Sequence, residues 1–93
     1  MKTISLDNEV IQTPGNLVSD MNGEKVMLSV KNGKYYNLGE VGGEIWMLLE
    51  KPITANQIIS ALIQKFDVNE DECREQVTVF LEHLYREDLI ENY

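Results

Sequence analysis

The residue types that most often carry out catalysis are few in this sequence and do not lie together. His83 is the only histidine and lies ten positions from the only cysteine, Cys73, and two such residues are too few for a metal-ligand set. Cys73 lies near the expected start of a helix, where a thiol pKa can fall, but there is no second cysteine to complete a redox cycle. Gly39, Gly42 and Gly43 form no phosphate-binding loop. We therefore expect a protein that is not an enzyme and that needs no metal or cofactor.

Length and charge narrow the choice further. A chain of 93 residues, 43% of them hydrophobic and 26% charged, is typical of one small folded domain. Sixteen acidic and eight basic residues give a formal net charge of −8. Most of this excess lies in residues 67–93, which carry nine acids and two bases. Such a charge disfavours binding to nucleic acid or to an anionic membrane.

The sequence carries no signal for export or anchoring. It has one cysteine and no signal-peptide pattern, so a disulfide framework is not expected. The longest apolar run covers only residues 45–49, far short of a membrane span. We expect a cytoplasmic protein.

Turn signals divide the first half of the chain into short strands. Residues 1–16 alternate weakly and form either an extra edge strand or a tail, followed by a domain over 17–93. The pairs Asn22-Gly23 and Asn32-Gly33 are each flanked by alternating residues, which is a strong hairpin signal. The expected strands form an antiparallel meander over about 17–21, 25–31 and 34–38.

The pattern of the middle strand suggests a register for the second hairpin. The residues predicted to face the core are Val26, Leu28 and Val30. A two-residue loop would place the apolar residues of the third strand opposite the polar set. A three-residue loop with Gly33 in the left-handed conformation instead pairs Leu28 with Tyr36 and Val26 with Leu38. We predict the second arrangement.

The second half of the chain has helical periodicity. One helix is expected near 40–50, and a capping box at Thr54 opens a second that continues to about Lys65. Asn69 can cap a third helix, whose first turn is acidic as the helix dipole favours. The predicted fold is α+β, with a three-stranded antiparallel meander followed by three helices in a winged helix-turn-helix-like arrangement.

The third helix has a wider apolar surface than one packing contact needs. Its members are Cys73, Val77, Phe80, Leu81, Leu84 and Tyr85. One edge of this arc is therefore expected to be available for binding, although the sequence does not indicate which edge.

Several segments together resemble the PqqD family. They are KYYNL at 34–38, EVGGEIWMLL at 40–49, PIT at 52–54, the helix with Ile58, Leu62, Phe66 and Asp67, VFLEHL at 79–84 and DLI at 88–90. More narrowly, the chain is similar over residues 17–91 to the stand-alone precursor-peptide recognition elements of lasso-peptide biosynthesis. Lasso peptides are a class of ribosomally synthesised and post-translationally modified peptides (RiPPs). It departs from the family where Gly39 replaces the usual Asn that caps the first helix.

The resemblance implies a non-catalytic module with two partners. It would bind the leader segment of a lasso-peptide precursor as an added strand on 34–38, against helix 69–87. It would then present the leader to a transglutaminase-like cysteine protease that removes it. The meander is consistent with this function, because its third strand has only one neighbour and leaves an edge for β-augmentation.

The candidate peptide-binding residues come from the strand and from the third helix. They are Lys34, Tyr35, Tyr36, Asn37 and Leu38, with Arg74, Val77, Thr78, Leu81, Leu84 and Tyr85. In the strand, Tyr36 and Leu38 are expected to face inward, and Tyr35 and Asn37 outward. In the helix, core packing is favoured for Val77, Phe80 and Leu84, while both roles stay open for Leu81 and Tyr85.

The same features allow other interpretations. The acidic residues of the third helix and its ends form either a solvated face or a surface that attracts a peptide carrying Lys or Arg. A winged-helix DNA-binding regulator fits the helices, but the acidic third helix would face the phosphates. A small adaptor between proteins stays open as a third function.

Overall fold

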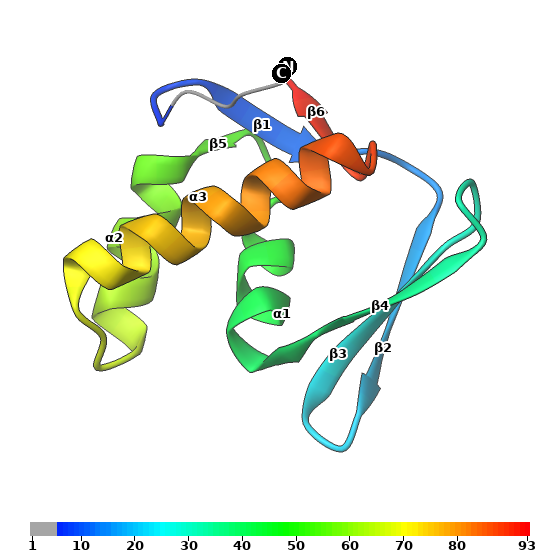
Figure 1. The fold of residues 1–93 in the computed structure, drawn as a ribbon, viewed down its shortest axis with the longest axis horizontal. Coiled ribbons are helices and arrows are strands. Elements are labelled where there is room, and N and C mark those ends of the chain that lie inside the picture. The colour runs from blue at the N-terminus through cyan, green and yellow to red at the C-terminus, as the bar shows by residue number, and fades with distance from the viewer. Residues whose placement is uncertain (1–5) are drawn as a thin grey trace.

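The computed structural model describes residues 6–93, which form an α+β fold of three helices and two three-stranded antiparallel sheets (Figure 1). The elements in chain order are β1 (Glu9–Gln12), β2 (Asn16–Met21), β3 (Glu24–Ser29), β4 (Lys34–Leu38), α1 (Gly39–Leu48), β5 (Ile53–Thr54), α2 (Ala55–Lys65), α3 (Glu70–Arg86) and β6 (Ile90–Asn92). The predicted meander followed by three helices is confirmed, and a second sheet is added to it.

The meander is the sheet β2-β3-β4, which projects to one side of the helices in Figure 1. Its first turn is the two-residue loop that Asn22-Gly23 predicts. Met21 pairs with Glu24, and the two loop residues have φ of 58° and 86°. Positive φ at both central residues is the type I′ geometry that Asn and Gly favour.

The predicted register of the second hairpin is wrong by one residue. Leu28 lies opposite Tyr35, and Met27 lies opposite Tyr36. The loop has four residues between the paired Ser29 and Lys34, not three. Gly33 does have the predicted left-handed conformation, with φ of 64°, and its N–H donates to the carbonyl of Ser29 at 2.8 Å.

The predicted core face of β3 is also wrong. Met27 and Ser29 are buried, whereas Val26 and Leu28 are half-buried and Val30 is 64% exposed. Because side chains alternate, the residues beside Met27 and Ser29 must point to the outer face. Ser29 is tolerated inside because its Oγ accepts a hydrogen bond from the N–H of Asn32 at 3.2 Å.

The second sheet, β5-β1-β6, joins distant parts of the chain. Its central strand β1 falls within the segment 1–16, for which the sequence predicts either an edge strand or a tail. Residues 1–5 of that segment lie outside the described residues. Gln12 pairs with Ile90, and the buried Val10 pairs with Ile53 on its other side. In Figure 1, β1 and β6 therefore lie side by side at one end of the molecule.

The helices begin with the caps that the sequence predicts at two of three positions. Thr54 and Gln57 form the capping box of α2, and Asn69 Oδ1 accepts from two N–H groups of α3 at 2.9 and 3.2 Å. At α1, Asn37 Oδ1 accepts from the N–H of Gly39 at 3.0 Å. Gly39 has φ of 72°, a conformation open to glycine, so the chain turns there from β4 directly into the helix.

The core lies where the three helices meet β1, β3 and β6. Its buried apolar residues are Val10, Met27, Leu38, Ile45, Trp46, Leu49, Ala55, Ile58, Ile59, Leu62, Cys73, Val77, Leu81, Leu84, Leu89 and Ile90. Within residues 6–93, none of the helices has the length and apolar character needed to cross a membrane.

Candidate functional site

The first feature of the site is the edge of β4. This strand pairs with β3 on one side, and no strand within residues 6–93 pairs with its other side. Alternate backbone N–H and C=O groups along such an edge point outward and can bind another strand. Tyr35, which is 74% exposed, and the exposed Asn37 point to the outer face, as predicted, while Tyr36 and Leu38 point inward.

The second feature is a hollow of about 390 Å³ beside the inner face of β4, which we call the apolar groove. Its walls come from the end of β4, α1, the α2–α3 connection and α3. The lining residues are Leu38, Val41, Gly42, Ile45, Leu62, Phe66, Asp67, Val68, Asn69, Glu72, Cys73, Gln76, Val77 and Phe80. The groove therefore lies next to the strand edge, as a guest strand on β4 would need.

Phe80 separates the apolar groove from a second, more open hollow on α3. That hollow is lined by Glu75, Gln76, Val79, Phe80, His83 and Arg86. Because Gln76 and Phe80 line both hollows, one continuous surface follows α3. Phe80 therefore contributes to the walls of both hollows.

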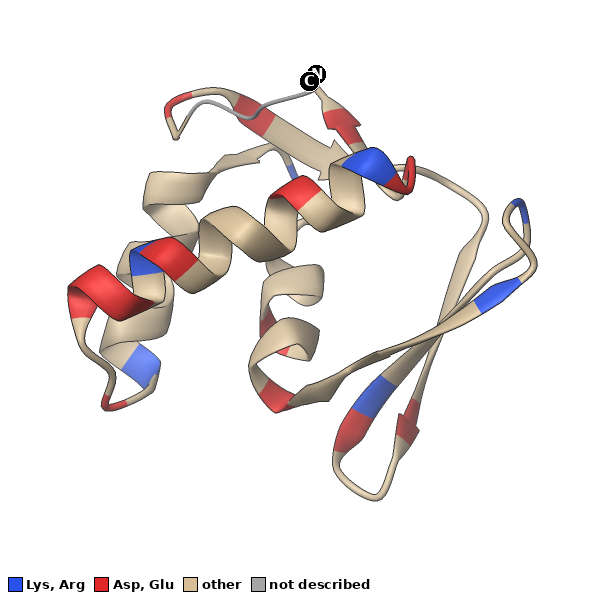
Figure 2. Ribbon diagram, viewed as in Figure 1, with Lys and Arg blue, Asp and Glu red and all other residues tan. Residues whose placement is uncertain are grey.

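The charged residues at the apolar groove are acidic. Asp67 and Glu72 are the charged residues among those of 6–93 that line it, and no lysine or arginine of this part of the chain does so. Glu72 also lies in the first turn of α3, which is acidic (Figure 2) and where a negative charge is stabilised by the helix dipole. An apolar side chain with a cationic neighbour suits this surface better than one with an anionic neighbour.

Cys73 lies in the groove wall but is poorly suited to nucleophilic chemistry. The side chain is buried, and burial raises the pKa of its thiol despite the nearby Arg74. A protonated thiol is a weak nucleophile. Among residues 6–93 there is also no group of three or more His, Cys, Asp or Glu side chains that could hold a metal ion.

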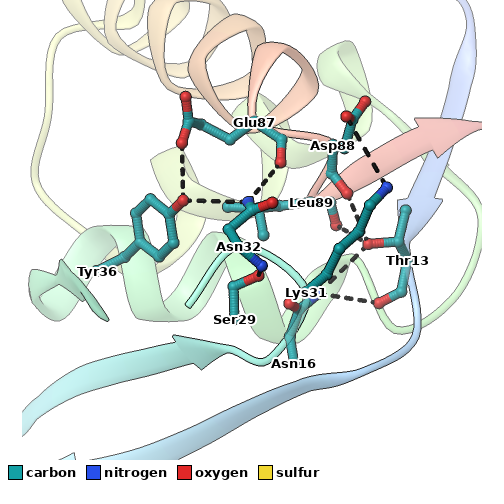
Figure 3. Close-up of polar contacts among 9 residues, drawn as sticks. All are labelled: Thr13, Asn16, Ser29, Lys31, Asn32, Tyr36, Glu87, Asp88 and Leu89. Atoms are coloured by element: carbon teal, nitrogen blue, oxygen red, sulfur yellow. Dashed lines mark hydrogen bonds and ion pairs between the residues drawn. The ribbon is translucent and has the colours of Figure 1, made fainter. Parts of the chain in front are cut away.

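The third feature connects β4 to the end of α3. Tyr36 Oη donates a hydrogen bond of 2.7 Å to Glu87 Oε1, and Asn32 Nδ2 donates to the Glu87 carbonyl at 2.9 Å (Figure 3). The Tyr36 ring lies edge-on to His83, with ring centroids 6.4 Å apart. Tyr36, which the sequence predicts as a peptide contact, therefore already contacts His83 of α3 and Glu87 just after it.

The contact between Tyr36 and Glu87 changes the pKa values of both groups. The Tyr36 hydroxyl lowers the pKa of Glu87, and the Lys34 ammonium at 3.5 Å lowers it further. Burial raises the pKa of Tyr36, and so does its hydrogen bond to Glu87. Both shifts favour the neutral phenol and the ionised carboxylate, which is the pair that forms the strongest hydrogen bond here.

The structure divides the predicted residues of α3 between different surroundings. Val77 lines the apolar groove. Leu81 and Leu84 are 0% and 1% exposed and lie in the core, away from the groove lining. Arg74 donates to Asn56 of α2, and the Tyr85 hydroxyl accepts from Asn92 of β6, so both side chains lie on the far side of the helix.

The edge of α3 that faces β4 is therefore the one that carries Gln76 and Phe80. Thr78 belongs to the other side, where its Oγ1 donates to the Arg74 carbonyl at 2.8 Å. The sequence placed Phe80 in the apolar arc but favoured a core role for it, and it did not identify Gln76, Val41 or Phe66. Only the width of the arc signalled that one edge was free.

The domain is a winged helix-turn-helix-like α+β fold, and its open edge strand beside an apolar groove is an arrangement suited to β-augmentation by an extended segment. The family model described as "Coenzyme PQQ synthesis protein D (PqqD)" matches residues 24–90. The chain thus belongs to the PqqD family, and the resemblance to PqqD-like RiPP recognition elements is confirmed.

Solved structures share the fold across nearly the whole chain. "TbiB1 in Complex with the TbiA(beta) Leader Peptide" is 26% identical, with a TM-score of 0.77 over 89% of this chain and 96% of that one. "Lasso peptide synthetase B1 complexed with the leader peptide" is 16% identical, with a TM-score of 0.75 over 89% and 98%.

A third structure is the PqqD part of Methylobacterium extorquens PqqCD, described as a functional and stand-alone RiPP recognition element. It is 17% identical, with a TM-score of 0.78 over 95% of this chain and 94% of that one. No curated protein sequence matches this chain. The three structures confirm the fold.

Proposed function

We propose that this protein binds the leader segment of a ribosomally synthesised lasso-peptide precursor, without catalysing a reaction on it. The leader adds as an antiparallel strand to the free edge of β4, and its inward side chains enter the apolar groove. The observation that carries the proposal is the position of this groove directly beside an unpaired strand edge. The two neighbours whose titles name a bound leader peptide support it.

The strand edge alone cannot supply useful affinity. β4 has five residues, so a guest strand makes about four main-chain hydrogen bonds, each worth a net ~1 kcal/mol. Micromolar binding requires about 8 kcal/mol. Two or three apolar side chains, each contributing ~1.5–3 kcal/mol when buried, would supply the rest before the cost of ordering the peptide.

The alternation of the guest strand determines which of its side chains matter. Residues on the same side as Tyr36 and Leu38 face α3 and the groove, and those between them lie beside Tyr35 and Asn37 on the outer face. We expect the leader to carry its apolar anchors at alternating positions on the inward side. Main-chain bonds then set the register, and the groove selects the side chains.

The test is a titration of isotope-labelled protein with the leader of a short precursor peptide encoded beside this gene. Saturable amide shifts are expected at 34–38 and on the groove side of α3, at Gln76 and Phe80. A leader with N-methyl groups on alternate residues of its strand segment is the matched control, because it keeps the side chains but loses hydrogen bonds. If the unmodified leader causes no saturable shift at either place, the proposal is wrong.

We also propose that the bound leader is presented to a leader peptidase of the transglutaminase-like cysteine protease class. The family resemblance supports this partner. The experiment is to measure leader cleavage by the candidate peptidase with and without this protein. Acceleration that saturates with the protein is expected, and a cleavage rate independent of it would exclude presentation.

A further inference from the structure

Two residues of the β3–β4 hairpin, Asn32 and Tyr36, meet Glu87, which lies more than 50 positions later in the sequence. Asn32 Nδ2 donates to the Glu87 carbonyl at 2.9 Å and to Tyr36 Oη at 3.3 Å, and Tyr36 Oη donates to Glu87 Oε1 at 2.7 Å. Figure 3 shows the three side chains converging from the β3–β4 loop, from β4 and from the residue after α3. We call them the Asn32–Tyr36–Glu87 cluster.

We propose that the Asn32–Tyr36–Glu87 cluster fixes the spacing between β4 and α3, so that a peptide can contact the strand edge and the apolar groove at the same time. The three are positioning residues, which act through the alignment of the two surfaces. The inference rests on the proposed function and assigns a role within it.

The two ends of β4 are held in different ways. At Leu38 the strand continues directly into α1 through Gly39, whose φ of 72° makes this junction a glycine turn. At the Lys34 end, the strand is held to α3 through the cluster and through the Lys34–Glu87 ion pair at 3.5 Å. Loss of the cluster would remove the side-chain hydrogen bonds that hold this part of β4 to the residue after α3.

The same turn after α3 also holds the beginning of the meander. The one hydroxyl hydrogen of Thr13 is shared between the carbonyls of Asp88 and Leu89, each 3.0 Å from Oγ1, and Asn16 Nδ2 donates to the Thr13 carbonyl at 3.1 Å (Figure 3). The start of β2 and the loop before β4 are therefore fastened to one short segment. This arrangement orients the whole meander relative to α3.

Alignment matters because the two half-sites are each weak. When one peptide spans two sites, binding at the first raises the effective concentration at the second only if the geometry allows both. A rigid spacing also avoids the cost of ordering the site on binding. Loss of the cluster should therefore weaken a peptide that spans both half-sites and leave a shorter peptide unaffected.

The test compares Tyr36→Phe with wild-type protein, using the full leader and a fragment limited to the strand segment. The substitution keeps the ring and removes only the hydroxyl. We expect the Kd of the full leader to rise about fivefold or more, as the loss of one charged hydrogen bond would give. We expect the Kd of the fragment to stay within about twofold.

Two further variants separate alignment from direct contact. E87Q keeps an acceptor oxygen for Tyr36 and should retain most of the affinity that E87A loses. T78A, on the far side of α3, is the matched control and should bind both peptides normally.

The outcomes are distinguishable. If wild-type protein binds no leader, the proposed function fails. If wild-type protein binds and Y36F and E87A bind the full leader equally well, the positioning role is wrong. Equal loss for the fragment and the full leader would show that Tyr36 touches the peptide directly, which also overturns it.

Discussion

Gly42 of α1 lies directly against the ring of Phe80 of α3. A Cβ at position 42 would lie 3.1 Å from Phe80 Cζ and 3.4 Å from the Cβ of Leu38. The distance to the Phe80 ring is shorter than an ordinary packing contact, so the missing side chain of Gly42 allows the ring to occupy its place in the groove wall. The shape of the apolar groove thus depends on a glycine.

The first prediction concerns this glycine. We expect the added methyl group of G42A to push the Phe80 ring into the groove and to weaken leader binding several-fold. The fold should persist, because alanine has a higher helix propensity than glycine. Calorimetric titration with the leader measures the effect. M47A, on the exposed side of the same helix, serves as the control, and unchanged affinity in G42A would show that Phe80 has room elsewhere.

The second prediction distinguishes the two edges of α3. We expect F80A to raise the Kd for the leader about tenfold, or about 1.4 kcal/mol, because it removes a wall shared by both hollows. Y85A should have a much smaller effect, because Tyr85 lies toward β6. A larger loss in Y85A than in F80A would mean that the opposite edge of the helix binds the peptide.

The third prediction concerns stability. Leu81 is fully buried, so we expect L81A to reduce the free energy of unfolding by about 2–5 kcal/mol. Urea denaturation followed by circular dichroism measures it, with T78A as the control on the same helix. Stability close to that of the wild type would show that Leu81 is not a core residue.

The fourth prediction concerns pH. The pKa of Glu87 is lowered in the folded protein, mainly by the Tyr36 hydroxyl. A lowered pKa contributes stability that is present above the ordinary glutamate pKa and is lost as the pH falls through the lowered value. When the pH falls from neutral through the lowered pKa of Glu87, we expect the free energy of unfolding to decrease more in the wild-type protein than in E87Q.

Urea midpoints measured across this range test the prediction. E82Q, which removes another carboxylate from α3, is the control for the change in net charge. Parallel curves for wild type and E87Q would show that the carboxylate of Glu87 contributes no pH-dependent stability.

The features that the sequence predicted correctly depend on neighbouring residues. The turn at Asn22-Gly23 and the caps at Thr54 and Asn69 need only local geometry, and each is present. The same holds for the left-handed Gly33. The inward position of Tyr36 and Leu38 is also correct, but only because the register shift and the exchanged face of β3 offset each other.

The features that were wrong or missed depend on residues far away in the sequence. In the observed β3–β4 register, Asn32 in the connecting loop hydrogen-bonds to Glu87, which lies 55 positions later in the sequence. The buried face of β3 is chosen by contact with α1, against a pattern in which Val26 and Leu28 look more apolar than Ser29. The edge of α3 that faces β4 depends on how the helix is rotated on the core, which periodicity does not define.

The sheet β5-β1-β6 has a consequence for how the protein is made. β1 is the central strand, yet its partner β6 ends at Asn92, so the ribosome must release the chain at least as far as residue 92 before this sheet can close. The hairpins of β2, β3 and β4 involve only nearby residues and can form much earlier. During synthesis, the edge that is proposed to receive a peptide would thus be exposed before the domain around it is complete, a period in which pairing with the wrong strand must be avoided.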